Sequence, residues 1–402
     1  MTMIDAKLVG ATGDGIHDDT VALQQALDVA RTGNYTGVFL SAGRYRITSA
    51  LFLRGTGVSL VGEGVRSVIV QDFHFHGQSG GGDTLWVMPE FDPHWLYPVA
   101  PVTHDSITLP GQVNISPGEA LFLCDGRGAT GLAEKRLGGV LPARDFHELA
   151  PCEYVDVAHT IYADGQTTIT LKNPVIGTRD YANVAPAGKN GSDLYLQLRR
   201  LRIPASNITV ANFAIDFADP KADCSIMVYY TRNASVGDIT IVREPRPAPA
   251  YGGIAVTGCM DSRIKHITAS GRAGVGLNSS RCCVVERCYV HSISMEECCT
   301  DNHLRNNFLR PTGGFGIRTN DMPCQRNMIV GNTIIGAAAN YGAIILWEGR
   351  DNMVAGNSAA NGDASIYIGS APGTLAEGNM AQAVTHYGKD KALITGNSVS
   401  SR

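Results

Sequence analysis

The chain has 402 residues, of which 46 are glycine and 17% are charged, and its formal net charge is −4. This balance gives no electrostatic basis for binding nucleic acid or an anionic membrane, and no apolar run approaches the roughly 20 residues of a transmembrane span. The high glycine content suits an all-β body with many turns.

The first segment, residues 1–71, is predicted to hold a capping helix and the first strands. Asp19 or Thr20 is a good N-cap for an amphipathic helix that runs to Ala30. The stripe expected to be buried is Val21, Leu23 or Gln24, Leu27 and Ala30. Strand-like segments follow at 37–40, 45–48 and 58–64. Met1–Asp5 lacks a basic region before an apolar core, so we expect no signal peptide.

Residues 72–200 interrupt this pattern with an aromatic and proline-rich stretch. Strands are expected at 105–109, 117–123, 153–158 and 167–171. We interpret this segment as a small β excursion looped out of one coil, and we expect the regular pattern to resume from residue 201 to residue 402.

An asparagine recurs through the C-terminal half, at Asn307, Asn332, Asn357, Asn379 and Asn397, with intervals of 25, 25, 22 and 18 residues. The last four follow a glycine, and the frame around them repeats: Met328-Ile-Val-Gly-Asn332 matches Met353-Val-Ala-Gly-Asn357. A period of roughly 20 to 30 residues with a fixed apolar frame indicates a solenoid. We read the asparagines as structural corner residues.

A second short strand with period-two alternation lies about ten residues before each asparagine. These strands are expected at 253–256, 274–277, 316–319, 343–346 and 365–368. Two or three short strands per repeat, with Gly and Asn at the corners, predict a right-handed parallel β-helix, an all-β solenoid.

The N-terminal sequence makes this fold recognisable. The run G-A-x-G-D-G-x-x-D-D-T-x-A-L-Q-x-A-L at residues 10–27, followed by Phe39–Ile47, resembles the pectate-lyase-like superfamily of right-handed parallel β-helices, and in particular bacteriophage tailspike depolymerases. The resemblance implies a capping helix, structural roles for Asp14, Asp18 and Asp19, and a homotrimer. It also implies a location on a phage tail, or export without a Sec signal.

The sequence offers no metal or cofactor site. Ten cysteines are present, but there is no C-x-x-C pair or histidine cluster at ligand spacing. We expect free cysteines packed as small hydrophobes, with Cys288 at the ladder position, and we expect neither a metal nor a cofactor.

Alignment of the upstream strands groups side chains on one outer face. Outward positions stack as Ala255/Thr257, Gly276/Asn278, Arg318/Asn320, Ile345/Trp347 and Tyr367/Gly369. Counting back ten residues from Leu304 puts Glu297 beside Arg318, and Asp321 and Glu348 fall one step past the strands. The expected cluster is Glu297, Arg318, Asp321, Trp347 and Glu348.

This cluster favours a polysaccharide-degrading glycoside hydrolase. Hydrolysis needs two carboxyls, which we place among Glu297, Asp321 and Glu348, and an exposed aromatic beside acids is typical of a sugar subsite. Arg318, Trp347, Tyr229 and Tyr367 are the expected substrate-binding residues. Two alternatives stay open: a polysaccharide lyase using His266, His291 or His303, or Tyr229 or Tyr230, with Arg318, and a non-catalytic spike or adhesin that only binds.

Overall fold

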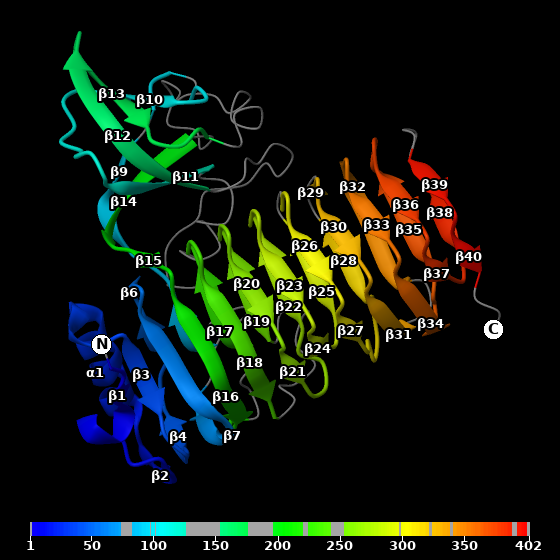
Figure 1. Ribbon diagram of the computed structural model, residues 1–402, viewed down its shortest axis with the longest axis horizontal. Coiled ribbons are helices and arrows are strands. Elements are labelled where there is room, and N and C mark those ends of the chain that lie inside the picture. Colours follow the sequence, from blue (N-terminus) through cyan, green and yellow to red (C-terminus); the bar gives the residue numbers. More distant parts are fainter. Residues whose placement is uncertain are drawn as a thin grey trace.

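The structure is a computed structural model that describes residues 2–73, 83–96, 98–100, 102–125, 153–175, 196–219, 224–242, 253–296, 299–320, 324–337, 341–387 and 392–399. The chain winds into an elongated parallel β-helix with its termini at opposite ends, which confirms the predicted fold class (Figure 1). Within the described ranges, two long sheets run the length of this solenoid, a 21-stranded sheet A and an 11-stranded sheet B.

Sheet A receives two short strands from most coils. Its strands are β1 (Ile4–Asp5), β2 (Asp14–Asp18), β3 (Gly37–Leu40), β4 (Gly43–Ile47), β7 (Ser59–Gln71), β16 (Thr209–Phe217), β18 (Ser235–Ile241), β20 (Arg263–Lys265), β21 (Thr268–Ala269), β23 (Val284–Glu286), β24 (Tyr289–Val290), β26 (His303–Arg305), β27 (Phe308–Leu309), β30 (Met328–Val330), β31 (Thr333–Ala337), β33 (Met353–Ala355), β34 (Ser358–Gly362), β36 (Leu375–Glu377), β37 (Met380–Ala381), β39 (Leu393–Thr395) and β40 (Ser398–Val399). Between β30 and β31 the chain turns at Gly331, whose φ of 65° explains the glycine before the ladder asparagine.

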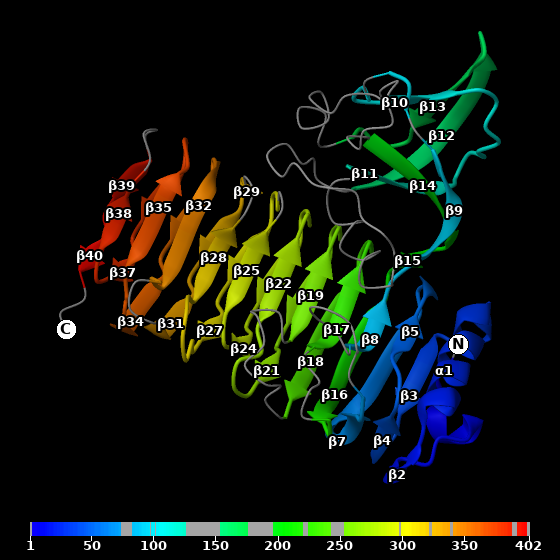
Figure 2. The ribbon, with the colours of Figure 1, turned by 180° about the vertical axis from the view of Figure 1, so that it is seen from behind.

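Sheet B receives one strand from each coil. Its strands are β5 (Leu51–Leu53), β8 (Asp83–Val87), β17 (Cys224–Tyr229), β19 (Ile254–Thr257), β22 (Val275–Asn278), β25 (Ile293–Glu296), β28 (Ile317–Asn320), β29 (Cys324–Gln325), β32 (Ile344–Arg350), β35 (Ile366–Ser370) and β38 (Val384–His386). Apart from β29, these strands stack in chain order along the solenoid, so sheet B is a continuous surface from the first coils to the last (Figure 2).

Inward-facing aliphatic side chains fill the space between the sheets. Ile264, Val285, Leu304, Ile329 and Val354 stand at paired positions of five successive coils, and each is fully buried. Stacking equivalent side chains buries one continuous core, which a single coil would be too small to form.

The asparagine ladder is confirmed as structural. The Asn307 Nδ2 donates to Asn332 Oδ1 at 2.9 Å, and the same contact repeats from Asn332 to Asn357, Asn379 and Asn397. A second ladder, which the sequence reading missed, joins Asn302, Asn327 and Asn352. Its members stand five residues before members of the first ladder, and this spacing is the signal that could have revealed it.

The capping helix is present as α1 (Thr20–Val29), preceded by the short helix η1 (Ala6–Val9) and followed by η2 (Ala30–Asn34). Leu23, Leu27 and Ala30 are buried as expected, but Val21 is 66% exposed because Ala26, not Val21, continues the buried face. Asp19 is structural, since its carboxylate accepts hydrogen bonds from the backbone N–H groups of Thr12 and Gly13.

The excursion starts later than residue 72, because β8 is a strand of sheet B that pairs with β5 and β17. Its strands form an antiparallel sheet: β9 (Glu90–Leu96), β10 (Ser106–Pro110), β11 (Ala120–Asp125), β12 (Glu153–Ala163), β13 (Gln166–Leu171) and β14 (Leu196–Ile203). This sheet has a hydrophobic core of its own and stands out from the N-terminal half of the solenoid (Figure 1). The chain re-enters the coils through β15 (Ala205–Ser206), which pairs with β6 (Gly55–Thr56).

Candidate functional site

The outer face of sheet B carries the predicted rows. Ala255 pairs with Gly276 and Thr257 with Asn278, and Arg318, Ile345 and Tyr367 stand side by side on consecutive coils. The register deduced for these strands from their inward Ile, Val and Leu residues is therefore confirmed.

The strand between β22 and β28 has a different register from the one expected. Ser294 lies beside Arg318, and Glu296 lies beside Asn320, because Ile293 and Met295 are the side chains that fill the core. Counting back from Leu304 failed because six residues, 297–302, connect β25 to β26. Glu297 itself lies outside the described residues.

Glu296 provides the carboxylate that meets Arg318. The Arg318 Nη2 donates to Glu296 Oε1 at 3.0 Å, and the guanidinium lies over the Phe315 ring with its carbon 4.3 Å from the ring centre. The Glu296 side chain is 7% exposed and that of Arg318 is 24% exposed, so the pair is largely withdrawn from water. An aromatic face and a carboxylate on one guanidinium hold it in one orientation.

Three buried polar atoms around this pair have no hydrogen-bond partner within the described part of the chain. They are Asn278 Oδ1, Ser294 Oγ and Arg318 Nε. Asn278 stands beside Glu296, and Ser294 stands beside Arg318. A buried polar group without a partner costs about 1–3 kcal/mol, and such groups in folded proteins call for a functional explanation or a bound water.

Trp347 and Tyr367 continue the face towards the C-terminal coils. Trp347 is 55% exposed, and its backbone N–H donates to Thr319 Oγ1 at 3.1 Å, which fixes the middle of β32 against β28. The Tyr367 hydroxyl donates to Asp363 Oδ2 at 3.1 Å. The structure thus brings Arg318, Trp347 and Tyr367 to one surface, as predicted from the sequence.

The remaining predicted carboxylates are only partly placed. The backbone of Glu348 pairs with Ser370 at the end of β32, whereas its side chain is outside the described part of the structure. Asp321 falls in the segment 321–323, which also lies outside the described residues.

Tyr229, one of the expected substrate-binding residues, is buried. It is 2% exposed and packs edge-to-face on Trp86, with ring centres 5.3 Å apart, inside a cluster that includes Tyr230 and Phe122. This cluster forms where the excursion rests on the first coils, and that contact between distant segments was not visible in the sequence.

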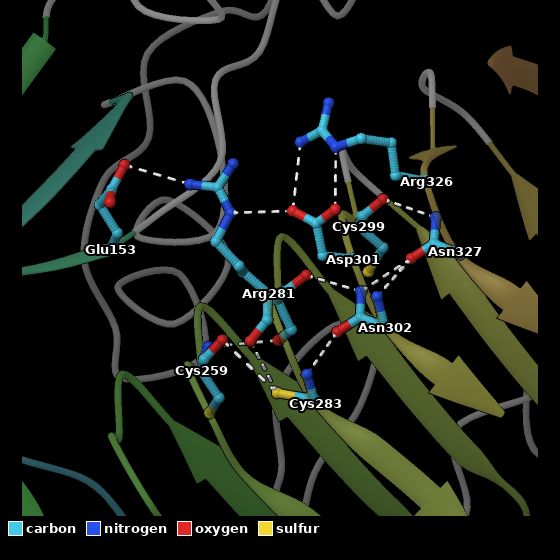
Figure 3. Close-up of polar contacts among 10 residues, drawn as sticks. Glu153, Cys259, Arg281, Cys283, Cys299, Asp301, Asn302, Arg326 and Asn327 are labelled. Atoms are coloured by element: carbon cyan, nitrogen blue, oxygen red, sulfur yellow. Dashed lines mark hydrogen bonds and ion pairs between the residues drawn. The ribbon is translucent and has the colours of Figure 1, made fainter. Parts of the chain in front are cut away.

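Ion pairs hold the excursion against the corner that follows the sheet B strands. Arg281 is fully buried, and its Nη1 lies 3.1 Å from Glu153 Oε1 of β12 (Figure 3). Its Nε lies 3.8 Å from Asp301, which also accepts hydrogen bonds from Arg326. Arg232 pairs with Asp156 in the same way, at 2.7 Å. These two ion pairs thereby fix β12 of the excursion against Arg281 and Arg232 of the coils.

The histidines proposed for a lyase are dispersed. His303 belongs to sheet A, and the exposed His266 lies 3.1 Å from Asp238. The His291 Nε2 accepts a hydrogen bond from the Thr312 N–H, and burial, aided by Arg272, lowers the pKa of this imidazole. None of the three stands at a position paired with Arg318.

Six cysteines among the described residues are free, as expected: Cys259, Cys282, Cys283, Cys288, Cys299 and Cys324. Burial raises the pKa of the Cys259 thiol to about 11. Cys288 does occupy the ladder position, where its N–H donates to Asn307 Oδ1. No group of three or more potential metal ligands occurs among the residues that the structure describes. In the same residues, no helix is both long and apolar enough to cross a membrane.

Comparison with known proteins agrees with this architecture. Residues 3–85 match the family model described as rhamnogalacturonase A/epimerase, pectate lyase-like, and residues 203–359 match the right-handed β-helix region. No curated protein sequence matches the chain.

Among solved structures, the tailspike gp61 of Pseudomonas phage phi297 is similar with 13% identity and a TM-score of 0.52, over 98% of this chain and 74% of that one. The surface adhesin PfbA of Streptococcus pneumoniae is similar with 12% identity and a TM-score of 0.56, over 99% of this chain and 90% of that one. At these identities the likeness concerns the fold. The chain is a right-handed parallel β-helix whose N-terminal part resembles the pectate-lyase-like family model, and its fold resembles that of a bacteriophage tailspike.

Proposed function

We propose that the outer face of sheet B binds a polysaccharide and that the chain hydrolyses it. The observation that carries this proposal is the continuity of the face, on which the Glu296–Arg318 pair, the exposed Trp347 and Tyr367 stand on consecutive coils. Coils repeat every ~4.8 Å, so this face offers an extended polymer one set of contacts after another.

The proposed binding residues each match a part of a sugar. The exposed indole of Trp347 offers a flat apolar surface for the C–H face of a pyranose ring. Arg318, which is 24% exposed and is oriented by Glu296, presents hydrogen-bond donors that suit hydroxyl groups. Because Tyr229 is buried, it has no place in this proposal.

Glu297, Asp321 and Glu348 remain the proposed source of the two catalytic carboxyls, one as general acid and the other as base or nucleophile. Carboxyls on adjacent coils would stand about 5 Å apart, near the separation of a retaining enzyme, and those two coils apart would suit an inverting one, at about 6.5–9.5 Å. Glu296 is not assigned this role, because Arg318 already holds its carboxylate.

A lyase acting on a uronate is less well supported. It needs a cation free to neutralise the uronate carboxylate, and the charge of Arg318 is already matched by Glu296 at 3.0 Å. A second carboxylate brought into this sparsely solvated place would be repelled by Glu296.

The test incubates the protein with a panel of bacterial capsular and exopolysaccharides and identifies the products by mass. New reducing ends support hydrolysis, whereas ultraviolet absorbance of an unsaturated uronide would replace this proposal with a lyase. Binding without products would leave a spike or adhesin.

The site assignment is tested with Glu348→Gln and Asp321→Asn, each expected to lower kcat by about 10²–10⁴-fold if its carboxyl takes part in proton transfer. Glu377→Gln is the matched control, since Glu377 is an exposed carboxylate of sheet A. Full activity of both site variants would overturn the assignment.

We also propose a homotrimer associated with a virion, because the structurally similar phi297 protein is a tailspike. Sedimentation velocity of the purified chain is expected to give the mass of three copies, and a monomer at micromolar concentration would contradict this.

A further inference from the structure

The last coils carry exposed aromatic side chains that the cleavage chemistry does not use. Tyr341 is 52% exposed, Trp347 55% and Tyr387 69%, and Tyr367 lies among them. We call Tyr341, Trp347, Tyr367 and Tyr387 the aromatic platform. Large exposed apolar groups gathered in one place usually mark a binding surface.

The register of sheet B explains why Trp347, Tyr367 and Tyr387 share one face. Tyr367 pairs with Ile345 on one side and with Thr385 on the other. Trp347 and Gly369 stand two residues further along β32 and β35, and Tyr387 directly follows β38, where its N–H donates to Ile368 O, so the three form the next outward row. The central member of that row, Gly369, has no side chain to stand between the two aromatic positions.

The rings are held in place by contacts with each other and with the backbone. Tyr367 and Tyr387 have ring centres 5.8 Å apart, with planes inclined by 36°. Tyr367 also lies on the backbone of Gly342, where an added Cβ would come within 2.5 Å of its ring. Tyr341 precedes this glycine, so the platform extends to the opening of β32.

A fixed carboxylate stands at the edge of the platform. Asp363 accepts hydrogen bonds from the backbone N–H groups of Gly342 and Ser365 and from the Tyr367 hydroxyl, at 3.1 to 3.2 Å. A carboxylate has about four acceptor positions, so one remains for a donor brought by a ligand. The Asp363 side chain is itself half-buried, and these three donors fix its direction.

Flat apolar faces beside an oriented acceptor match the chemistry of a pyranose ring, which has an apolar C–H face and hydroxyl donors at its edge. The aliphatic neighbour Ile345 is only 4% exposed, and the surrounding outward residues include Gly369 and Thr385. A stable protein interface uses about 20–30 residues a side, many more than this platform provides.

We propose that the aromatic platform extends the carbohydrate-binding face from Trp347 and Tyr367 to Tyr341 and Tyr387, and that these added rings hold pyranose units of the polysaccharide away from the cleavage position. The proposal rests on the proposed function for the identity of the polymer, but it requires binding only and not cleavage. The polymer then runs along the solenoid, from the coil of Arg318 towards the coil of Tyr387.

The test compares the wild type with the double variant Tyr341→Ala/Tyr387→Ala on an array of purified bacterial capsular and exopolysaccharides. Binding is expected to weaken by about 5- to 150-fold, since two aromatic contacts of about 0.5–1.5 kcal/mol each are lost. Tyr341→Phe/Tyr387→Phe keeps the rings and is expected to bind like the wild type. Tyr162→Ala, which removes a ring of the same 52% exposure from β12 of the excursion, is the matched control.

Unchanged binding of the double alanine variant, or no binding of the wild type to any polymer of the array, would overturn the proposal. An altered oligomeric state with intact binding would show instead that the platform joins copies of the chain. Weaker binding of the double variant, with no cleavage product from either protein, would support the platform and refute the hydrolase. Cleavage with the same KM in the wild type and the double variant would support the hydrolase and refute the platform.

Discussion

Asn332 joins three coils of the solenoid through one side chain. Its Oδ1 accepts from the backbone N–H and the Nδ2 of Asn307, and its Nδ2 donates to Leu304 O and to Asn357 Oδ1, at 2.9 to 3.0 Å. The residue is fully buried, so water does not compete for these bonds. Because the amide has both an acceptor and a donor, the same residue type can repeat indefinitely along the stack.

Asn332→Ala is therefore expected to lower the free energy of unfolding by at least about 3 kcal/mol, since several buried groups lose their partners at about 1–3 kcal/mol each. Asn397→Ala, at the partly exposed end of the same ladder, is expected to cost about 1 kcal/mol. Urea denaturation measures both. Equal losses at the two positions would show that burial does not determine the strength of the ladder.

Residue types explain why one ladder was predictable and the other was not. Four members of the first ladder follow glycine, so the pair is conspicuous in the sequence. In the second ladder, Asp301, Arg326 and Asp351 take the positive φ before Asn302, Asn327 and Asn352. These residues adopt a positive φ less readily than glycine, so their presence in the sequence does not indicate a turn.

At the scale of elements, the excursion depends on its contacts with the coils. The Arg281 guanidinium is fully buried against Glu153 of β12, and the Tyr154 hydroxyl donates to the backbone carbonyl of Tyr230. A buried charge that loses its counter-ion is costly, whereas exposed pairs contribute little. The ion pair between Arg281 and Glu153 should therefore contribute most of the free energy that holds the excursion on the coils.

Glu153→Gln is expected to destabilise the protein by about 3 kcal/mol, with Asp301 at 3.8 Å from Arg281 limiting the loss. Glu119→Gln is the comparison, because its partner Arg200 is 37% exposed, and there the expected loss is below about 1 kcal/mol. Urea denaturation and limited proteolysis of the excursion measure the two effects. A smaller loss for Glu153→Gln than for Glu119→Gln would refute a dominant role for the buried pair.

The elements themselves were largely predictable, but their junctions were not. Alternation located β22, β28, β32 and β35, because their inward residues are aliphatic. The position of β25 was predicted wrongly, because the alternation of apolar residues within strands does not determine the length of the connection between β25 and β26. The packing of the excursion on Tyr229 and Arg281 joins segments far apart in the chain, and no local pattern records such a contact.

At the scale of the whole molecule, the candidate site depends on the register in which the strands of successive coils are stacked. Arg318, Trp347 and Tyr367 share a face only because three strands stack in one alignment, and a slip of one residue would turn an outward side chain into the core. For the same reason the sequence predicted this surface, while the carboxylates Glu297, Asp321 and Glu348, whose side chains lie outside the described part of the structure, stay predictions.

A solenoid whose coils contact only their neighbours should tolerate the loss of one complete coil. Deleting residues 333–357 joins Asn332 to Ser358, the register partner of Thr333, and lets β28 meet β35 in the alignment that β32 had. The shortened chain is expected to keep its β-sheet circular dichroism and one cooperative unfolding transition, at a lower midpoint. It should lose polysaccharide cleavage, because Trp347 and Glu348 are deleted.

Deleting one residue fewer, 333–356, leaves an extra residue at the corner, and this chain should fold less stably. Equal stability of the two deletions would show that the 25-residue spacing of the ladder does not set the register.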